Sequence, residues 1–274
     1  MKKFTFNKQF MVLMFLLLNC FASYAADENL ITKQITLNLT EAGTLPNKIG
    51  SSKKNLITNL KIIGEINGTD LRFIREMAGC NAYGISTSGN LSVLDLSETR
   101  IVEGGDYYFV RYDDDDDHNL YTCNDIIGEY AFFGCSSLTS VNIPSSVTGI
   151  GNKVFRGCTS LTSINIPSSV TEIGWYAFSG CSSLTSVNIP SSVKSIGDYT
   201  FSSCSSLTSV NIPSSVTWIG DGAFSGCSSL TSVNIPSSVT CIEHKTFKGC
   251  TSLTSVNIPS SMRGIGEYAF CNCI

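Results

Sequence analysis

A cysteine recurs every 23 residues along the second half of this 274-residue chain, and this period constrains the fold more than any other feature. The positions run from Cys135 to Cys273, and the unit between them is close to CSSLTSVNIPSSVTxIGxxAFxG. A fixed period of this length is typical of a solenoid, in which each unit forms one coil. One coil cannot bury its apolar side chains alone, so the sequence predicts a stack of coils that stabilise one another.

The apolar positions of the unit predict which side chains face the core. Leu138, Val141 and Ile143 fit the pattern L-x-x-L-x-L of a leucine-rich repeat strand, and we expect them to point inward. The polar residues between them are expected to point outward, and Pro144 ends the strand because proline lacks a backbone donor. Strands of successive coils then form a parallel sheet with a spacing of about 4.8 Å.

The unit LTSVNIPSSVTxIGxxAFxGCSS resembles the BspA-like class of leucine-rich repeats, and the resemblance covers residues 124–274. The segments Ile57-x-x-Leu60-x-Ile62 and Leu91-x-x-Leu94-x-Leu96 are similar to the looser repeats at the start of such proteins. The resemblance implies an α/β-type solenoid, mostly β, with right-handed coils and a parallel sheet on the concave face. It also implies a secreted or cell-surface protein that binds other macromolecules, host proteins among them, without catalysis. No cofactor is expected.

The chain divides into three predicted segments. Residues 1–25 combine lysines, an apolar stretch and the cleavage signal Ser23-Tyr24-Ala25, which is typical of a secretory signal peptide. Cys20 offers the alternative of a lipid anchor, so the exported protein is expected to be secreted or attached to the outer surface. Residues 26–123 are expected to form a capping region with divergent repeats and an acidic loop. Residues 124–274 form the repeat array.

Two elements of the capping region are predicted in detail. The alternation over residues 35–39 predicts a strand, and Thr69 or Asp70 is expected to cap a helix over residues 71–78. The run Asp113 to Asp117 is expected to be a solvated loop. At the other end, the array stops one residue into the seventh unit, without a cap. Either the reading frame is a fragment, or the last coil associates with another chain.

The charge distribution argues against a nucleic-acid partner. Residues 26–134 carry 9 basic and 17 acidic side chains, and residues 135–274 carry 6 and 5. Neither part has the basic surface that binds phosphate backbones. After the signal segment, no apolar stretch is long enough to span a membrane. The expected partner is therefore an extracellular protein or a glycan.

The cysteines fall into two groups with different expectations. The cysteines of the 23-residue ladder are expected to remain free and buried, because a buried thiol packs as a small apolar side chain. Cys80 and Cys123 lie outside the ladder, and in an exported protein they are the most plausible disulfide pair.

Comparison of the units gives two candidate binding surfaces and one weaker metal site. Aromatic side chains break the uniformity of three successive units, where they are expected to form a ligand-binding patch; they are Trp175, Tyr176, Tyr199 and Trp218. The alternative is the repeated amide ladder on the strand face, formed by Asn165, Asn188, Asn211 and Asn234. Asp221, His244 and Glu267 share one column and would be the ligands of any metal site, although no metal is expected. No nucleophile motif indicates a catalytic site.

Overall fold

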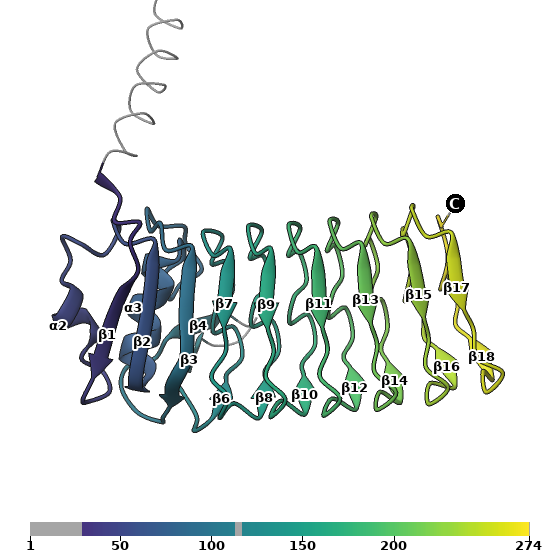
Figure 1. Ribbon diagram of the computed structural model, residues 1–274, viewed down its shortest axis with the longest axis horizontal. Coiled ribbons are helices and arrows are strands. Elements are labelled where there is room, and N and C mark those ends of the chain that lie inside the picture. The colour runs from purple at the N-terminus through teal and green to yellow at the C-terminus, as the bar shows by residue number, and fades with distance from the viewer. Residues whose placement is uncertain (1–28, 113–116, 274) are drawn as a thin grey trace, which may run out of the picture.

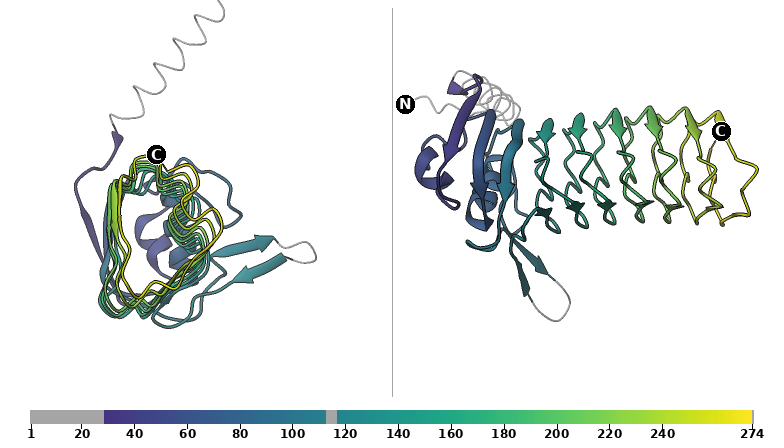
Figure 2. Two further views of the ribbon diagram at one scale, coloured as in Figure 1. Left: turned by 90° about the vertical axis from the view of Figure 1, so that its right-hand side faces the viewer. Right: turned by 60° about the horizontal axis from the view of Figure 1, so that its bottom comes forward.

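The computed structural model describes residues 29–112 and 117–273; the predicted signal peptide, Cys20 and most of the acidic run lie outside the described residues. The strands follow one another along one axis from the N-terminal part to the last coil (Figure 1). Viewed along that axis, the coils of the array superpose on one outline (Figure 2). The predicted, mostly β solenoid of parallel strands is confirmed. None of the helices in the described part of the chain has the length and apolar character needed to span a bilayer.

The strands of the N-terminal region continue the sheet of the repeat array. The sheet has the order β1-β2-β3-β7-β9, with all neighbours parallel. Its strands are β1 (Ile35–Leu39), β2 (Asn59–Ile66), β3 (Val93–Ile101), β7 (Ser140–Asn142) and β9 (Ser163–Asn165). The strand predicted over residues 35–39 is confirmed. Leu60 and Leu94 of the two looser repeats lie opposite each other in register, and both are fully buried.

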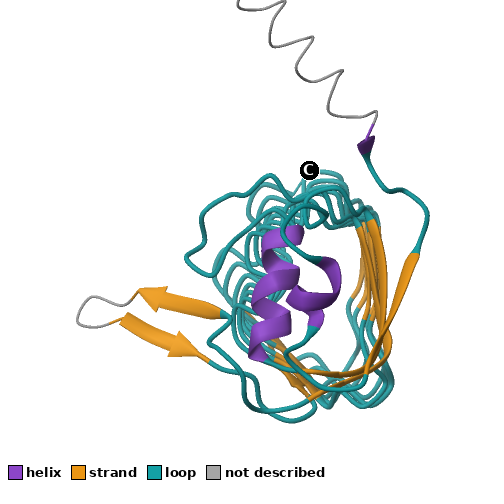
Figure 3. Ribbon diagram, turned by 90° about the vertical axis from the view of Figure 1, so that its left-hand side faces the viewer, coloured by secondary structure: helices purple, strands orange, loops and turns teal. Residues whose placement is uncertain are grey.

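Two helices connect the N-terminal strands and lie at that end of the stack (Figure 3); they are α2 (Leu45–Ile49) and α3 (Gly68–Met77). The predicted cap of the second helix at Thr69 or Asp70 is wrong, because α3 begins earlier and Asn67 is its N-cap. The Asn67 side chain accepts the Thr69 N–H at 3.0 Å, and the Asp70 carboxylate accepts the Asn67 N–H at 3.1 Å. This reciprocal pair satisfies donors that the first turn leaves free.

A short antiparallel hairpin projects from the side of the stack (Figure 2). Its strands are β4 (Phe109–Tyr112) and β5 (Asp117–Leu120). At its base the ring of Phe109 stacks on Tyr130 with a centroid distance of 4.9 Å. The hairpin is therefore anchored to the first turn of the array by aromatic packing.

Each coil of the array contributes two short strands that run parallel to the equivalent strands of neighbouring coils, and strand pairing is interrupted between β9 and β11, between β13 and β15 and between β14 and β16. The first set continues from β7 and β9 with β11 (Ser186–Asn188), β13 (Ser209–Asn211), β15 (Ser232–Asn234) and β17 (Ser255–Asn257). The second set is β6 (Ile126–Ile127), β8 (Gly149–Ile150), β10 (Glu172–Ile173), β12 (Ser195–Ile196), β14 (Trp218–Ile219), β16 (Cys241–Ile242) and β18 (Gly264–Ile265).

The core of the array is a set of identical side chains stacked along the axis. Leu138, Val141 and Ile143 are buried, which confirms the predicted orientation of the strand. One phenylalanine from each coil stacks on the next, from Phe132 to Phe270, with centroid distances of 5.2–5.6 Å. Such offset stacks add to the stabilisation that comes from burying apolar area.

The ladder cysteines are free, as predicted, and those from Cys158 onward donate a hydrogen bond. The thiol of Cys204, for example, donates to the Phe178 carbonyl of the preceding coil at 3.2 Å, and the other ladder thiols from Cys158 onward repeat this bond. The predicted bridge between Cys80 and Cys123 is wrong, since both are free. Cys80 is buried against the Arg75 guanidinium, whereas Cys123 is exposed.

A buried arginine joins the N-terminal region to the array. Arg75, near the end of α3, is fully buried, and its guanidinium donates to the carbonyls of Tyr130, Ala131 and Phe133 at 2.8–3.1 Å. It also donates to the Asn81 carbonyl at 2.9 Å, and it lies 4.7 Å from the Phe109 ring centroid. No salt bridge among the described residues includes it. Backbone carbonyls therefore take the place of a counterion.

Candidate functional site

The four aromatic residues singled out in the sequence lie on the turn side of three successive coils, and we call this surface the aromatic flank (Trp175, Tyr176, Tyr199 and Trp218). The indole of Trp175 is 55% exposed and that of Trp218 is 38% exposed. Tyr176 and Tyr199 are half-buried and stack on each other, with a centroid distance of 4.9 Å and an interplanar angle of 8°. The flank thus combines a fixed tyrosine pair with two accessible tryptophans.

The two tyrosines occupy a position where the backbone is left-handed. Tyr176 has a φ of 57° and Tyr199 a φ of 53°, a region that non-glycine residues rarely adopt. Their N–H groups donate to the Asp198 and Asp221 carbonyls of the following coils at 2.9 and 2.8 Å. The inter-coil hydrogen bonds therefore offset the cost of the backbone conformation and fix where the rings project.

Glycines provide the space in which these rings lie. A Cβ atom on Gly197 would lie 2.8 Å from Trp175 Cδ1, and one on Gly220 would lie 2.8 Å from Trp218 Cη2. A Cβ atom on Gly222 would collide with the ring of Tyr199. The absence of side chains at these positions lets the aromatic rings lie against the backbone of the flank.

The strand face, which is the alternative surface, is chemically uniform. Its asparagines Asn165, Asn188, Asn211 and Asn234 are exposed, as the amide ladder requires. Its threonine hydroxyls bond within the stack: Thr208 Oγ1, for example, donates to the Thr185 carbonyl at 3.2 Å. Because the same bond recurs from coil to coil, the threonine hydroxyls of this face are already used as donors. The asparagines and the exposed serines remain as accessible polar groups, although Asn234 Oδ1 accepts the Asn257 side-chain N–H at 2.8 Å.

The carboxylates of the weak metal candidate have a structural role instead. Asp221 Oδ1 accepts the His244 N–H at 3.1 Å, and Asp198 Oδ1 accepts the Asp221 N–H at 2.9 Å. The ring of His244 lies edge-on to Tyr268, and Glu267 is exposed. In the described part of the chain, no group of three His, Cys, Asp or Glu side chains is arranged to hold a metal ion. Asp198 and Asp221 therefore fix adjacent coils together.

A second aromatic cluster, in the N-terminal region, was not foreseen from the sequence. The hydroxyls of Tyr83 and Tyr107 lie 2.9 Å apart, and the Arg72 guanidinium lies 4.5 Å from the Tyr107 ring centroid. The hydrogen bond between the two hydroxyls raises the pKa of Tyr83 and lowers that of Tyr107. The run Tyr107-Tyr108 beside a hairpin was the available signal, but its partners lie 24 and 35 residues away.

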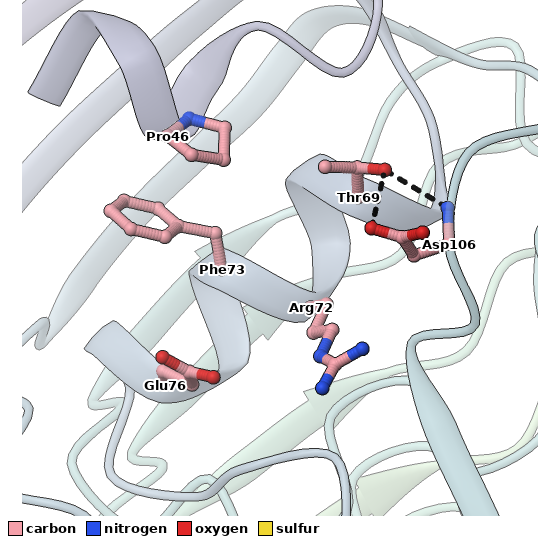
Figure 4. Close-up of a pocket in the computed structure, with 6 residues that line it drawn as sticks. All are labelled: Pro46, Thr69, Arg72, Phe73, Glu76 and Asp106. Carbon is pink, nitrogen blue, oxygen red and sulfur yellow. Dashed lines mark hydrogen bonds between the residues drawn. The ribbon is translucent and has the colours of Figure 1, made fainter. Parts of the chain in front are cut away.

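Arg72 also lines a shallow cavity of about 190 Å³ between α2, α3 and the loop before the hairpin (Figure 4). Pro46 and Phe73 supply its apolar wall, while Thr69 is hydrogen-bonded to Asp106 on the opposite side. The other polar groups are engaged too, since Glu76 pairs with Lys54 at 2.6 Å. The cavity is formed by structural contacts and presents no unpaired charged cluster.

A second groove, of about 260 Å³, opens on the turn side of the first coils, where β8 has a glycine. Gly149, Gly151 and Gly174 provide its floor, and Glu129 and Glu172 stand at its sides. Glu129 pairs with Arg111 at 3.2 Å, whereas Glu172 is exposed. The groove reaches Glu172 and Gly174 of the coil that carries Trp175 and Tyr176, so it adjoins the aromatic flank on the surface of the array.

Comparison with known proteins places the repeats in a described group. The model of the BspA type leucine rich repeat region matches residues 125–240 and 217–274, with 6 copies. No curated protein matches the sequence. Among solved structures, a Treponema pallidum leucine-rich repeat protein is 41% identical, with 54% of this chain and 69% of that chain covered and a TM-score of 0.53.

Two further solved structures are bacterial leucine-rich repeat proteins. A leucine-rich repeat protein from Eubacterium ventriosum is 17% identical over 88% of this chain and 90% of its own, with a TM-score of 0.51, which shows a shared fold. One from Bacteroides ovatus is 30% identical over 60% of this chain and 48% of its own, with a TM-score of 0.49. The Eubacterium ventriosum match, at 88% coverage of this chain, extends into the N-terminal region.

Proposed function

We propose that this chain, which belongs to the BspA-type leucine-rich repeat family, is an exported protein that binds an extracellular macromolecule through its aromatic flank. Repeats of this family generally bind proteins and are typically non-catalytic. The proposed place of action is outside the cell or on its surface, as the signal segment predicts. The residues proposed to make the contact are Trp175, Tyr176, Tyr199 and Trp218.

One observation carries the proposal: the flank is a singular surface in an otherwise repetitive array. A specific partner needs a patch that occurs once, and the strand face repeats the same threonine, serine and asparagine in every coil. Exposed tryptophans are enriched in the centres of interfaces because they bury a large area at a low cost in side-chain entropy. Trp175 and Trp218 are the only tryptophans of the chain, and both are accessible.

Binding of a glycan is the second candidate. Exposed indole rings also stack on the apolar faces of sugars, and the amide ladder of the strand face offers regularly spaced donors and acceptors to a repetitive polysaccharide. The two candidates differ in the surface used and in the class of ligand. Both are addressed by one comparison of variants.

The test uses the full chain on arrays of extracellular-matrix proteins and of glycans. A flank variant carries Trp175→Ser, Tyr199→Ser and Trp218→Ser, and a strand-face variant carries Asn188→Lys, Asn211→Lys and Asn234→Lys. We expect the flank variant to lose most binding, by at least about tenfold in Kd, while circular dichroism shows an unchanged fold. If only the strand-face variant lost binding, the amide ladder would be the binding surface, and the proposal would be contradicted.

A further inference from the structure

We infer that the aromatic flank receives a lysine or arginine side chain of the partner, held between the indoles of Trp175 and Trp218 and the carboxylates of Glu172 and Asp198. This inference rests on the proposed function and specifies the chemistry of the partner: a protein segment with an exposed basic side chain. Three features of the flank carry it, namely the register of the strands, the glycines beneath the indoles and two carboxylates that form no ion pair among the described residues. Asp198 accepts the Asp221 N–H through Oδ1 at 2.9 Å and keeps its negative charge and its second oxygen for a ligand.

The register of the second set of strands leaves a gap between a carboxylate and an indole. Ile173 pairs with Ile196, and Ser195 pairs with Trp218, so Glu172, Ser195 and Trp218 occupy successive rungs of one column. Neighbouring rungs are about 4.8 Å apart. Glu172 and Trp218 are exposed, whereas the short Ser195 between them is half-buried. One extended side chain of a partner therefore has room between the two larger groups.

The equivalent glycines Gly197 and Gly220 leave room on the same surface for a second indole and a second carboxylate, those of Trp175 and Asp198. Trp175 and Asp198 occupy equivalent positions of adjacent coils, and Trp175 Cδ1 lies over Gly197. Gly220, one coil further, is approached by both Asp198 Oδ1 and Trp218 Cη2. Trp175 thus reaches the glycine of the following coil and Trp218 lies over the glycine of its own coil, so the two indoles cover neighbouring glycines, with the Asp198 carboxylate close to the edge of the Trp218 ring.

The two carboxylates favour a cation beside the indoles. The tyrosine pair already has one, because the Arg156 guanidinium lies 5.4 Å from the Tyr176 ring centroid, so we place the partner's cation at the tryptophans. Neither Glu172 nor Asp198 forms a salt bridge among the described residues, and the exposed Lys194 of the same surface is not within ion-pair distance of either. Indole faces attract cations, and a guanidinium stacks on an aromatic ring while it pairs with a carboxylate. A neutral sugar would gain from the rings but not from two negative charges.

Tryptophan fluorescence reports binding at this site directly, because Trp175 and Trp218 are the only tryptophans in the sequence. The probe is acetylated, amidated hexa-arginine, titrated at low salt while tryptophan emission is recorded. The informative variant is Glu172→Gln with Asp198→Asn, which removes both charges and leaves the indoles in place. Asparagine is compatible with the fold at position 198, since Asn152 in the equivalent position accepts the Trp175 N–H at 2.8 Å. The matched control is Glu243→Gln with Glu267→Gln, which removes two array carboxylates outside the site.

We expect a saturable change in emission with the unmodified chain and the control, and a Kd at least about tenfold weaker for the double variant. An unchanged Kd in the double variant would overturn the inference. So would a saturable response to chitohexaose in the absence of one to hexa-arginine, which would favour the glycan alternative.

The binding screen on immobilised matrix proteins and glycans, described above, separates failure of this inference from failure of the proposed function. If a partner is lost by the Trp→Ser variant and retained by Glu172→Gln with Asp198→Asn, the flank binds but the cation is not what it recognises. If the partner is retained by both, neither the flank nor its charges take part. Loss in both, with retention in the Glu243→Gln, Glu267→Gln control, supports the inference.

Discussion

The N-terminal region and the repeat array belong to one solenoid but are stabilised in different ways. The described salt bridges all lie between residues 54 and 129, and none lies within 135–273. The N-terminal region relies on individual polar contacts such as the Asn67 cap and the Arg75 guanidinium. The array repeats one phenylalanine, one thiol and one backbone ladder in every coil. Repetition gives stability without singular contacts, so a singular patch on the array is notable.

The largest expected effect is selective loss of the array at alkaline pH. Burial raises the pKa of Cys135, Cys204 and Cys250 to about 12, and it raises those of Cys158, Cys181 and Cys227 well above the ordinary value. Above a pH of about 9 the unfolded chain loses thiol protons that the folded chain retains, so stability falls as pH rises. Each thiol contributes a decrease of up to roughly 1.4 kcal/mol per pH unit until the pH reaches its folded pKa.

Urea unfolding followed by tryptophan emission measures this effect, because both tryptophans lie in the array. Replacing Cys181, Cys204 and Cys227 by alanine should flatten the decrease between pH 9 and about 12, despite lower stability at neutral pH. Thiol alkylation at neutral pH should be slow for the ladder and fast for exposed Cys123. Rapid labelling of the folded ladder, or a decrease that the alanines leave unchanged, would contradict the assignment.

The next effect is expected at the junction between the two regions. Arg75→Ala removes a guanidinium that satisfies four carbonyls, and it should lower the free energy of unfolding by about 3–5 kcal/mol. Arg100→Ala is the matched control: its ion pairs with Glu65 and Asp125 are 3.6–3.9 Å long and its side chain is 56% exposed, so the loss should stay below about 1 kcal/mol. Equal urea midpoints for the two variants would show that Arg75 does not join the regions.

The smallest effect concerns the left-handed column of the array. Lys245 has a φ of 56°, where glycine is favoured, and Gly222 already occupies the equivalent position one coil earlier. Lys245→Gly should therefore raise stability by up to about 1 kcal/mol. Lys248→Gly, three residues later and outside the left-handed positions, should lower it by a similar amount. Thermal unfolding of the two variants measures this difference. If both substitutions shifted the melting temperature in the same direction, the backbone at Lys245 would not be strained.

The two regions also differ in how much of them the sequence predicts. In the array, Leu138, Val141 and Ile143 are buried and the ladder cysteines are free, as their spacing indicated. The residues of the aromatic flank were identified from the sequence, but the stacking of Tyr176 on Tyr199 and the position of each indole over a glycine depend on rotamers and on neighbouring coils. Asp221 was assigned to a metal candidate because its hydrogen bond to the His244 N–H cannot be deduced from spacing.

The sequence alone determined the solenoid, because a 23-residue period places equivalent residues of successive coils in contact and one unit's pattern serves for all. The N-terminal region lacks this redundancy. Three of the four carbonyls that Arg75 binds are separated from it by 55–58 residues, and the cluster of Tyr83, Tyr107 and Arg72 joins three separate segments. Cys80 lies against that buried arginine and Cys123 lies at the surface. Whether these two cysteines could form a disulfide was likewise decided by the fold. Contacts of this kind occur once each, and only the tertiary structure brings their members together.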